Sequence, residues 1–236
     1  MGNRIGALEQ GFQIFPAVLA HGQVAELKRE FTRPSENGAA GIRGLLLANR
    51  AVRDLASSAE LLALANLALP APAFAVRAIL FDKTPATNWK VPWHQDLAVA
   101  LTENRDVDGF GPWSVKDGVP HAHAPESLLE RMITLRLHLD GCPAENGALR
   151  VLPGSHRHGK LGAAEITDWR QRVPEVVCEV PAGGVLLMRP LLLHASSASI
   201  RPGHRRVLHL EYACDDLPGG LGWAERPPFP GNFGGD

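Results

Sequence analysis

The sequence predicts a mainly β (α+β) protein, an antiparallel sandwich or barrel preceded and covered by helices. Residues 17–31 and 51–68 carry apolar side chains at intervals of three and four, which is typical of amphipathic helices. After Pro70 and Pro72 the chain changes to short aliphatic segments separated by Gly, Pro or polar turns. Because helices do not alternate regularly with these segments, a doubly wound parallel sheet is disfavoured.

Seven aliphatic segments are expected to be strands. They are residues 74–81, 88–101, 132–140, 147–153, 175–180, 184–194 and 205–213. A length of 236 residues suits a single domain. We expect residues 1–73 to be its helical N-terminal part, 74–213 its β core, and 214–236 a Gly- and Pro-rich extension. That extension is either a tail or an extended segment laid on the barrel.

Composition and charge exclude several classes of partner. The chain has 24 Lys+Arg and 25 Asp+Glu, so no overall charge attracts nucleic acid or an anionic membrane. The first ten residues lack the apolar core of a signal peptide, and the apolar stretch 61–76 is interrupted by Asn66, Pro70 and Pro72. The three cysteines lack the close pairs of a zinc or dithiol motif. We expect a soluble, cytoplasmic protein without nucleic-acid or membrane partners.

The stretch NWKVPWHQDLAVAL, residues 88–101, places a histidine and an aspartate in an apolar strand. In an extended chain His94 and Asp96 point to one face and Gln95 to the other. A carboxylate on an apolar face needs a cation or a hydrogen-bond donor. Alone, His-x-Asp is more often a surface or hydrogen-bonded pair than a metal site. The apolar run ending at His194 supplies a candidate third ligand.

Two histidines and one carboxylate leave coordination positions open, as in non-haem Fe(II) oxygenases. A structural zinc site usually has four ligands, often cysteine, and no cysteine lies near either segment. Such oxygenases commonly draw two electrons from a 2-oxo acid, whose distal carboxylate suits the guanidinium fork of arginine. Arg205 follows His194 by eleven residues. Arg205 and Arg206 face opposite ways on a strand, so only one of them points into the barrel.

Three segments together resemble the phytanoyl-CoA dioxygenase family of Fe(II)/2-oxoglutarate oxygenases. They are VPWHQD, LRLHLDGCPAENGALRVLPGSHRHGKL and GGVLLMRPLLLHASSASIRPGHRRVLHLEYA. The resemblance covers about residues 74–213 and implies a jelly roll, or double-stranded β-helix, with the N-terminal helices packed on one sheet. It implies iron held by His94, Asp96 and His194, and 2-oxoglutarate bound by Arg205 and Ser196.

The implied reaction is hydroxylation of an unactivated C–H bond of a small molecule by O2, with release of succinate and CO2. The carboxylate of Asp96 favours hydroxylation, because related halogenases have a small residue at that position. A cupin-type jelly-roll protein that binds a metal but does not use 2-oxoglutarate is the alternative, and a non-catalytic binding module is a third. For the substrate the sequence indicates only a weak preference for a small polar metabolite, since a fold does not determine it.

Other polar residues have two interpretations each. The irregular insertion 102–125 is either a lid or a surface loop. If it is a lid, Trp113, Lys116, His121 and His123 are candidates to touch substrate. Arg136 and His138 face either the core or the cavity, and Arg77 and Lys83 are either surface charges or ligands of a carboxylate. The pairs His121/His123 and His156/His158 lie in loops without a carboxylate at ligand spacing, so each is a weak candidate for a metal site.

Overall fold

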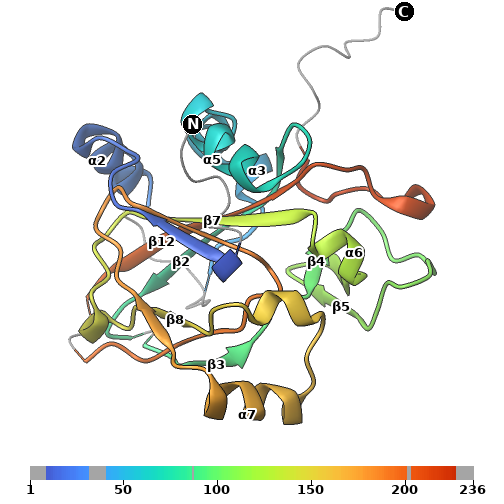
Figure 1. Cartoon of the computed structure of the whole chain (residues 1–236). Helices are drawn as coiled ribbons and strands as arrows, with labels where there is room; N and C mark the ends of the chain where they lie inside the picture. The colour runs from blue at the N-terminus through green and yellow to red at the C-terminus, as the bar shows by residue number, and fades with distance from the viewer. Residues whose placement is uncertain (1–8, 32–40, 87, 201–202, 227–236) are drawn as a thin grey trace, which may run out of the picture.

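The strands form two facing antiparallel sheets with a smaller third sheet beside them (Figure 1). The computed structural model describes residues 9–31, 41–86, 88–200 and 203–226. The larger sheet has the order β1 (Phe12–Phe15), β10 (Val185–Met188), β7 (Met132–His138), β12 (Arg205–Ala213) and β2 (Phe74–Lys83). The second has the order β3 (Val91–His94), β11 (His194–Ser196), β8 (Leu149–Val151) and β9 (Val176–Cys178). This arrangement confirms the predicted jelly roll, although in the described residues the sheets do not close into a continuous barrel.

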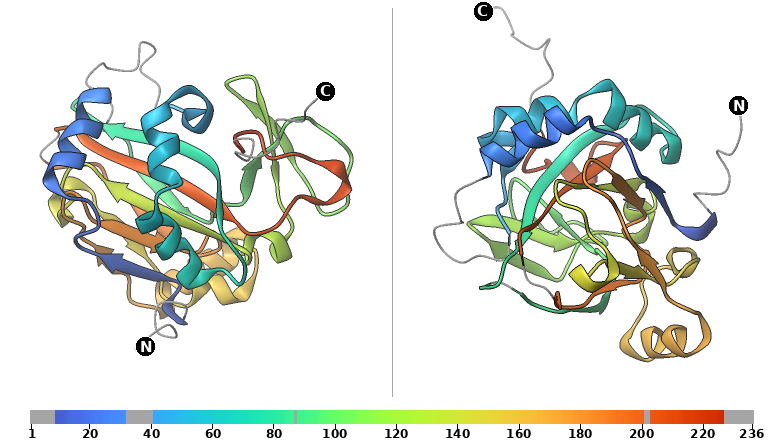
Figure 2. Two further views of the ribbon diagram at one scale, coloured as in Figure 1. Left: turned by 90° about the horizontal axis from the view of Figure 1, so that it is seen from above. Right: turned by 90° about the vertical axis from the view of Figure 1, so that its left-hand side faces the viewer.

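The N-terminal helices lie on the outer face of the larger sheet, as predicted (Figure 2). They are α2 (His21–Glu30), α3 (Leu45–Ala48), α4 (Arg50–Ala56) and α5 (Ala59–Ala68). The side chains of Leu208, Leu210 and Tyr212 alternate towards them and are fully buried. The Tyr212 hydroxyl donates a hydrogen bond to the Ala56 carbonyl at 2.9 Å, which ties the sheet to the helical layer.

Two helix predictions were wrong in their limits. The first helix begins at His21 rather than at residue 17. The second is two helices, because Asn49 and Ser58 each cap a separate start by accepting the backbone N–H of Val52 and Leu61. Among the described residues, no helix combines the length and the apolar character needed to cross a bilayer.

Two strand predictions were too long. Residues 88–101 form β3 and β4 (Ala98–Ala100), and residues 184–194 form β10 and the start of β11. At the first break the backbone N–H of Asp96 donates to the Pro190 carbonyl at 2.9 Å, so the two interruptions contact each other. Asp96 therefore lies on a bend, not on a continuous strand.

The insertion 102–125 is not irregular. It contains β5 (Trp113–Lys116) and β6 (Val119–His123), which with β4 form the third sheet in the order β4-β6-β5. The described chain also contains β1, which the sequence pattern did not predict. The remaining elements are α6 (Glu126–Leu129), α7 (Ala163–Arg172) and 3-10 turns at Ala144–Asn146, Ser155–His158 and Pro218–Gly220.

The inner face of the larger sheet is polar. In the register of β2 and β12, Lys83 lies opposite Arg205 and Arg77 lies opposite Glu211, with Ile79 opposite His209 between them. The outward-facing residues of the same strands are apolar and pack under the helices. Strand alternation thus directs charged side chains between the two sheets, where water-filled or ligand-filled space is needed.

The described part of the C-terminal extension, residues 214–226, lies along the fold. Trp223 forms a β-bridge with Leu101, and the Glu225 carboxylate accepts the backbone N–H groups of Leu46 and Ala78 at 3.3 and 3.2 Å. Glu225 is only 5% exposed. Its carboxylate therefore fixes α3 and β2 to the end of the chain.

We expect Glu225→Ala to lower the free energy of unfolding by about 1–3 kcal/mol, because two buried donors lose their acceptor. Urea denaturation monitored by circular dichroism measures the change. Glu225→Gln keeps one acceptor oxygen and should lose less, and Glu60→Ala on an exposed helix face should lose nothing measurable. An unfolding free energy of Glu225→Ala equal to that of the wild type would show that the hydrogen bonds of the Glu225 carboxylate do not stabilise the fold.

Candidate metal centre and adjoining cavity

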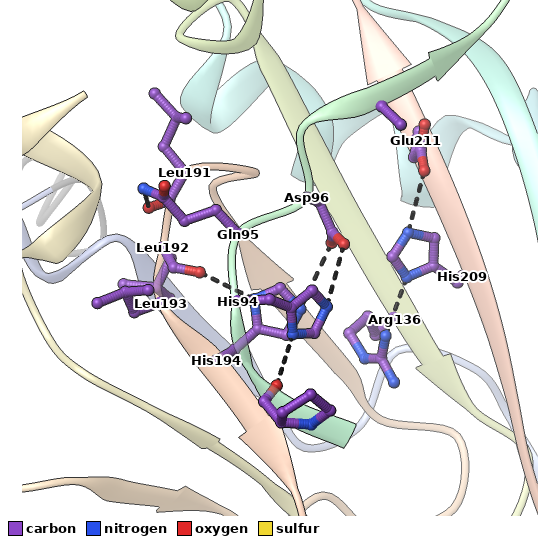
Figure 3. A network of polar contacts seen from close by, with 12 residues as sticks. His94, Gln95, Asp96, Arg136, Leu191, Leu192, Leu193, His194, His209 and Glu211 are labelled. Carbon is purple, nitrogen blue, oxygen red and sulfur yellow. Dashed lines mark hydrogen bonds and ion pairs between the residues drawn. The ribbon is translucent and has the colours of Figure 1, made fainter. Parts of the chain in front are cut away.

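Two histidines and one aspartate converge between the sheets (Figure 3). His94 ends β3 and His194 begins β11, and the two are direct partners across the strand pair, with ring centroids 4.2 Å apart. The Asp96 carboxylate reaches both: Oδ1 lies 3.6 Å from His94 Nε2, and Oδ2 lies 3.6 Å from His194 Nε2. One ligand atom from each residue lies within 4.8 Å of the others.

The hydrogen bonds of the histidines leave their Nε2 atoms for a ligand. Nδ1 of His94 lies 2.8 Å from the Pro92 carbonyl, and Nδ1 of His194 lies 2.8 Å from the Leu192 carbonyl. A carbonyl only accepts, so each Nδ1 carries a proton, and in the neutral ring each Nε2 has a lone pair directed at Asp96. Two lone pairs and a carboxylate around one point repel each other unless a cation lies between them. The three residues fit a metal ion.

The electrostatics of the group support the same interpretation. Burial alone would raise the pKa of Asp96, but His194 and His94 lower it below its ordinary value, so the carboxylate is ionised. Burial lowers the pKa of His194 to about 4, so its ring is neutral at pH 7. Asp96 Oδ2 is buried and, in the part of the chain that the structure describes, has no hydrogen-bond donor. An ionised, buried carboxylate oxygen without a donor is satisfied by a metal.

Gln95 holds the bend that carries the aspartate. As its alternation predicts, it points away from the site, and its amide donates to the Gly159 and Leu191 carbonyls at 2.8 and 2.7 Å. Its carbonyl oxygen accepts the backbone N–H of Leu161 at 2.8 Å. The bend is thereby tied both to the loop before β11 and to the segment before α7.

A cavity of about 570 Å³ adjoins the three residues and is lined by both sheets. Its described lining contains six basic side chains and two carboxylates. The basic residues are Arg43, Arg77, Lys83, Lys116, Arg136 and Arg205, and the acidic ones are Asp96 and Glu211. A volume of this size is typical of small-molecule sites.

One end of the cavity holds three basic residues. Arg205 is 5% exposed and donates to the carbonyls of Asn146 and Gly147, while its buried Nε has no hydrogen-bond partner among the described residues. Lys83 Nζ donates to Ser196 Oγ at 3.1 Å. Burial, followed by repulsion from Arg205, lowers the pKa of Lys83 to about 7, and the same two causes lower the pKa of Arg136 to about 10. Positive charges held this closely favour a bound anion.

Gly147 allows Arg205 to take this position. Its φ of 68° lies in the left-handed region, and a Cβ atom there would lie 2.4 Å from the Ser197 carbonyl oxygen. Glycine is therefore the residue that fits where the Asn146–Gly147 turn approaches both Ser197 and the guanidinium group.

Of the other residues expected to touch substrate, some line the cavity and others do not. Arg136 and His123 line the cavity, and Arg136 Nη1 lies 2.9 Å from His209 Nδ1. His121 is buried behind the lining, with Nε2 at 3.2 Å from Arg77 Nη2. Trp113 packs against an apolar cluster with Leu101 and Trp223 and does not line the cavity.

His138 is 2% exposed, and neither ring nitrogen has a hydrogen-bond partner in the described chain. Burial, followed by the charge of Arg136, lowers its pKa to about 3. It is a neutral, buried side chain. Among the described residues neither His121/His123 nor His156/His158 forms a group of three metal-ligating side chains.

Sequence reasoning left several lining residues unassigned. Lys83 and Arg77 were open between two interpretations, and both are buried in the cavity wall. Arg77 and Lys83 share one face of β2 with Ile79 and Phe81, which also line the cavity, and this alternation is the sequence pattern that could have identified them. Glu211 lies in the same phase on β12 as Arg205, but it was not singled out.

Comparison with known proteins gives consistent matches. A family model described as phytanoyl-CoA dioxygenase (PhyH) matches residues 8–207. L-proline trans-4-hydroxylase of Streptomyces griseoviridis is 26% identical over 164 residues, 58% of this chain and 53% of that protein, so the chain matches about half the length of this curated relative.

Two solved structures have similar folds. AviO1 from Streptomyces viridochromogenes Tue57 superposes with a TM-score of 0.62 and 26% identity, covering 96% of this chain and 97% of that one. HygX from Streptomyces hygroscopicus, solved with nickel and 2-oxoglutarate bound, superposes with a TM-score of 0.63 and 19% identity, covering 88% and 83%.

Proposed function

The chain belongs to the phytanoyl-CoA dioxygenase family, whose members use Fe(II) and 2-oxoglutarate, and on that premise we propose that it hydroxylates an unactivated C–H bond of a small molecule. One observation carries the proposal: the His94, Asp96 and His194 group faces a cavity whose end holds Arg205 and Lys83, and the side chains of these two form no ion pair with a carboxylate in the described residues. A divalent metal and a dicarboxylate together satisfy both features.

We assign the two histidine Nε2 atoms and the Asp96 carboxylate as the ligands of Fe(II). Arg205 binds the distal carboxylate of 2-oxoglutarate through its guanidinium group, and Ser196 donates its hydroxyl to the same carboxylate while accepting from Lys83. When bound, Fe(II) and 2-oxoglutarate supply the oxidising chemistry, in which O2 and 2-oxoglutarate yield hydroxylated substrate, succinate and CO2.

The chain's own residues then have three tasks. The carbonyls of Pro92 and Leu192 keep each histidine in the tautomer that binds the metal. Gln95 keeps the bend with Asp96 in place. The β4-β6-β5 sheet places Lys116 and His123 in the cavity wall, and we propose that it acts as a lid that limits access of water to the site.

Metal-dependent binding of the cosubstrate tests the proposal. Calorimetric titration with 2-oxoglutarate is expected to give at least about tenfold tighter binding with Ni(II) present than with a chelator, because the cosubstrate contacts both the metal and Arg205. Ni(II) is chosen to prevent turnover. Equal affinity in both conditions would contradict the assignment, and a bound metal without any 2-oxoglutarate binding would favour the cupin-type alternative.

The lowered pKa of Lys83 predicts a pH effect. At a pKa of about 7, Lys83 is largely neutral at pH 8 in the absence of an anion, and a bound dicarboxylate favours its charged form. Binding of 2-oxoglutarate should therefore take up a proton above pH 7, and its affinity should fall by up to about tenfold per pH unit towards pH 9. Calorimetry in buffers with different ionisation enthalpies measures the uptake. Lys83→Met should abolish it, and an unchanged uptake in that variant would assign the proton to another group.

A further inference from the structure

The end of the cavity opposite Arg205 carries a second cluster of basic residues. On β2, Arg77 lies six residues from Lys83, which is about 20 Å along a strand. Ile42 pairs with Leu80 on the edge of β2, which brings Arg43 to the middle of this strand, and Arg43 forms an ion pair with Asp117, the neighbour of Lys116. Lys116, at the end of β5, comes from the third sheet. The three side chains reach the cavity from separate segments.

The carboxylates near this cluster neutralise it only in part. Arg77 Nη1 forms an ion pair with Glu211 at 3.1 Å, and Glu211 is shared with His209. Arg43 pairs with Asp117 at 2.9 Å, but the Asp117 side chain is 66% exposed and lies outside the lining. The Nε atoms of Arg43 and Arg77 are buried, and neither has a hydrogen-bond partner within the described ranges.

Lys116 has no hydrogen bond or ion pair to any residue in the described part of the chain. Burial lowers its pKa, and the charges of Arg77 and Arg43 lower it further, while Glu211 and Asp96 act in the opposite direction. The ammonium group therefore lies within electrostatic reach of both the basic cluster and the proposed iron ligand.

The charge balance of the cavity remains positive when the proposed cofactor is bound. Six basic side chains face two carboxylates in the described lining. The two positive charges of Fe(II) and the two negative charges of 2-oxoglutarate cancel, so the excess stays. The second cluster lies at the end away from Arg205, where the substrate has room. Arg77 is paired with Glu211 and Arg43 with Asp117, so the member of the cluster without a counter-ion in the described residues is Lys116, whose side chain is exposed at the cavity. An anionic substrate would supply that counter-ion.

We propose that the substrate is an acid, whose carboxylate or phosphate group is bound by Lys116 together with Arg43 and Arg77. This inference rests on the proposed function and adds the substrate's chemical class. The guanidinium forks of the two arginines suit either group, while Lys116 supplies a charge that can adjust to the ligand. Anchoring the acid at this end orients the rest of the molecule towards the metal centre.

Matched pairs of ligands test the proposal on protein saturated with Ni(II) and 2-oxoglutarate, in which no turnover occurs. Calorimetry compares benzoate with benzamide, nicotinate with nicotinamide, and L-proline with L-prolinamide, and phenyl phosphate tests the phosphate group. At least one acid is expected to bind about tenfold more tightly than its amide, or phenyl phosphate more tightly than phenol. If no anion binds more tightly than its uncharged or amide partner, the proposal is overturned.

Variants of Lys116 connect this preference to the cluster. Lys116→Gln should weaken the best-binding acid by about tenfold, and Lys116→Glu should abolish its binding, because a carboxylate then faces the ligand. Lys90→Gln, an exposed lysine outside the cavity, should bind like the wild type. An unchanged affinity in Lys116→Gln overturns the role of the cluster. Titration with 2-oxoglutarate in the same variants should be unchanged, so loss of the cosubstrate site is measured separately from loss of the acid site.

Discussion

Asp96→Ala is expected to reduce succinate formation to background and to weaken Fe(II) binding by more than about 100-fold. Loss of an outer-shell partner alone typically costs 10- to 100-fold in metal affinity, and Asp96 is assigned as a direct ligand. It supplies the only negative charge among the three proposed ligands. Removing it leaves two neutral imidazoles, which hold a divalent ion weakly. Fe(II) binding under anaerobic conditions and succinate release in air measure the two effects.

Folding should be affected much less than metal binding. Asp96 Oδ2 has no hydrogen-bond donor among the described residues, so removing the carboxylate leaves no buried donor there unpaired. The thermal midpoint of Asp96→Ala in the presence of a chelator should therefore match the wild type closely. Asp54→Ala, an exposed carboxylate on α4, is the matched control and should retain both activities. Turnover of Asp96→Ala at the wild-type rate would remove Asp96 from the site.

Arg205→Ala is expected to weaken 2-oxoglutarate binding by about 2–5 kcal/mol, or at least about 30-fold, with Fe(II) affinity unchanged. Arg205 is buried, and its Nε has no hydrogen-bond partner in the described chain, so this N–H is available to donate to the cosubstrate's carboxylate. Arg205→Lys keeps the charge but not the fork and should recover only part of the loss. Calorimetric titration of Ni(II)-loaded protein with 2-oxoglutarate measures both variants.

The neighbouring arginine provides a control from the opposite face of the strand. Arg206 forms an ion pair with Asp140, with Nε–Oδ2 at 2.8 Å and Nη2–Oδ1 at 3.0 Å. Arg206→Ala should lower stability because it breaks this pair, while 2-oxoglutarate affinity stays at the wild-type level. If Arg205→Ala bound 2-oxoglutarate as tightly as the wild type, the cosubstrate would have to bind elsewhere.

The sequence predicted the features that depend on local pattern. Strand alternation separated Arg205 from Arg206, and the structure places Arg205 inside the cavity and Arg206 on Asp140. The break after β3 was not predictable from the apolar run. It arises because Asp96 N–H bonds to the carbonyl of Pro190, about a hundred residues away in the chain. His94 and Asp96 do face one site, but the strand alternation that predicted this ends at His94 and does not include Asp96.

Residues that reach the cavity through long-range packing were also missed. Arg43 lies in a segment without periodicity, and only its neighbour's bridge to Leu80 brings it to β2. Lys83 and Glu211 were visible as charges on strands, but strand phase alone does not say which face is covered by helices. The covered face is the one that carries the apolar residues of the same strands, such as Tyr212, because these pack under the N-terminal helices.

The most direct test of the account is anaerobic titration of the purified protein with Fe(II) and then 2-oxoglutarate, monitored by visible absorption. A 2-oxo acid chelated to ferrous iron gives a weak charge-transfer band. We expect this band in the wild type and in Arg206→Ala, and we expect its loss in His194→Ala and Arg205→Ala at the same ligand concentrations. Iron binding without the band would contradict the 2-oxoglutarate assignment, and an undiminished band in both site variants would place the cosubstrate outside this cavity.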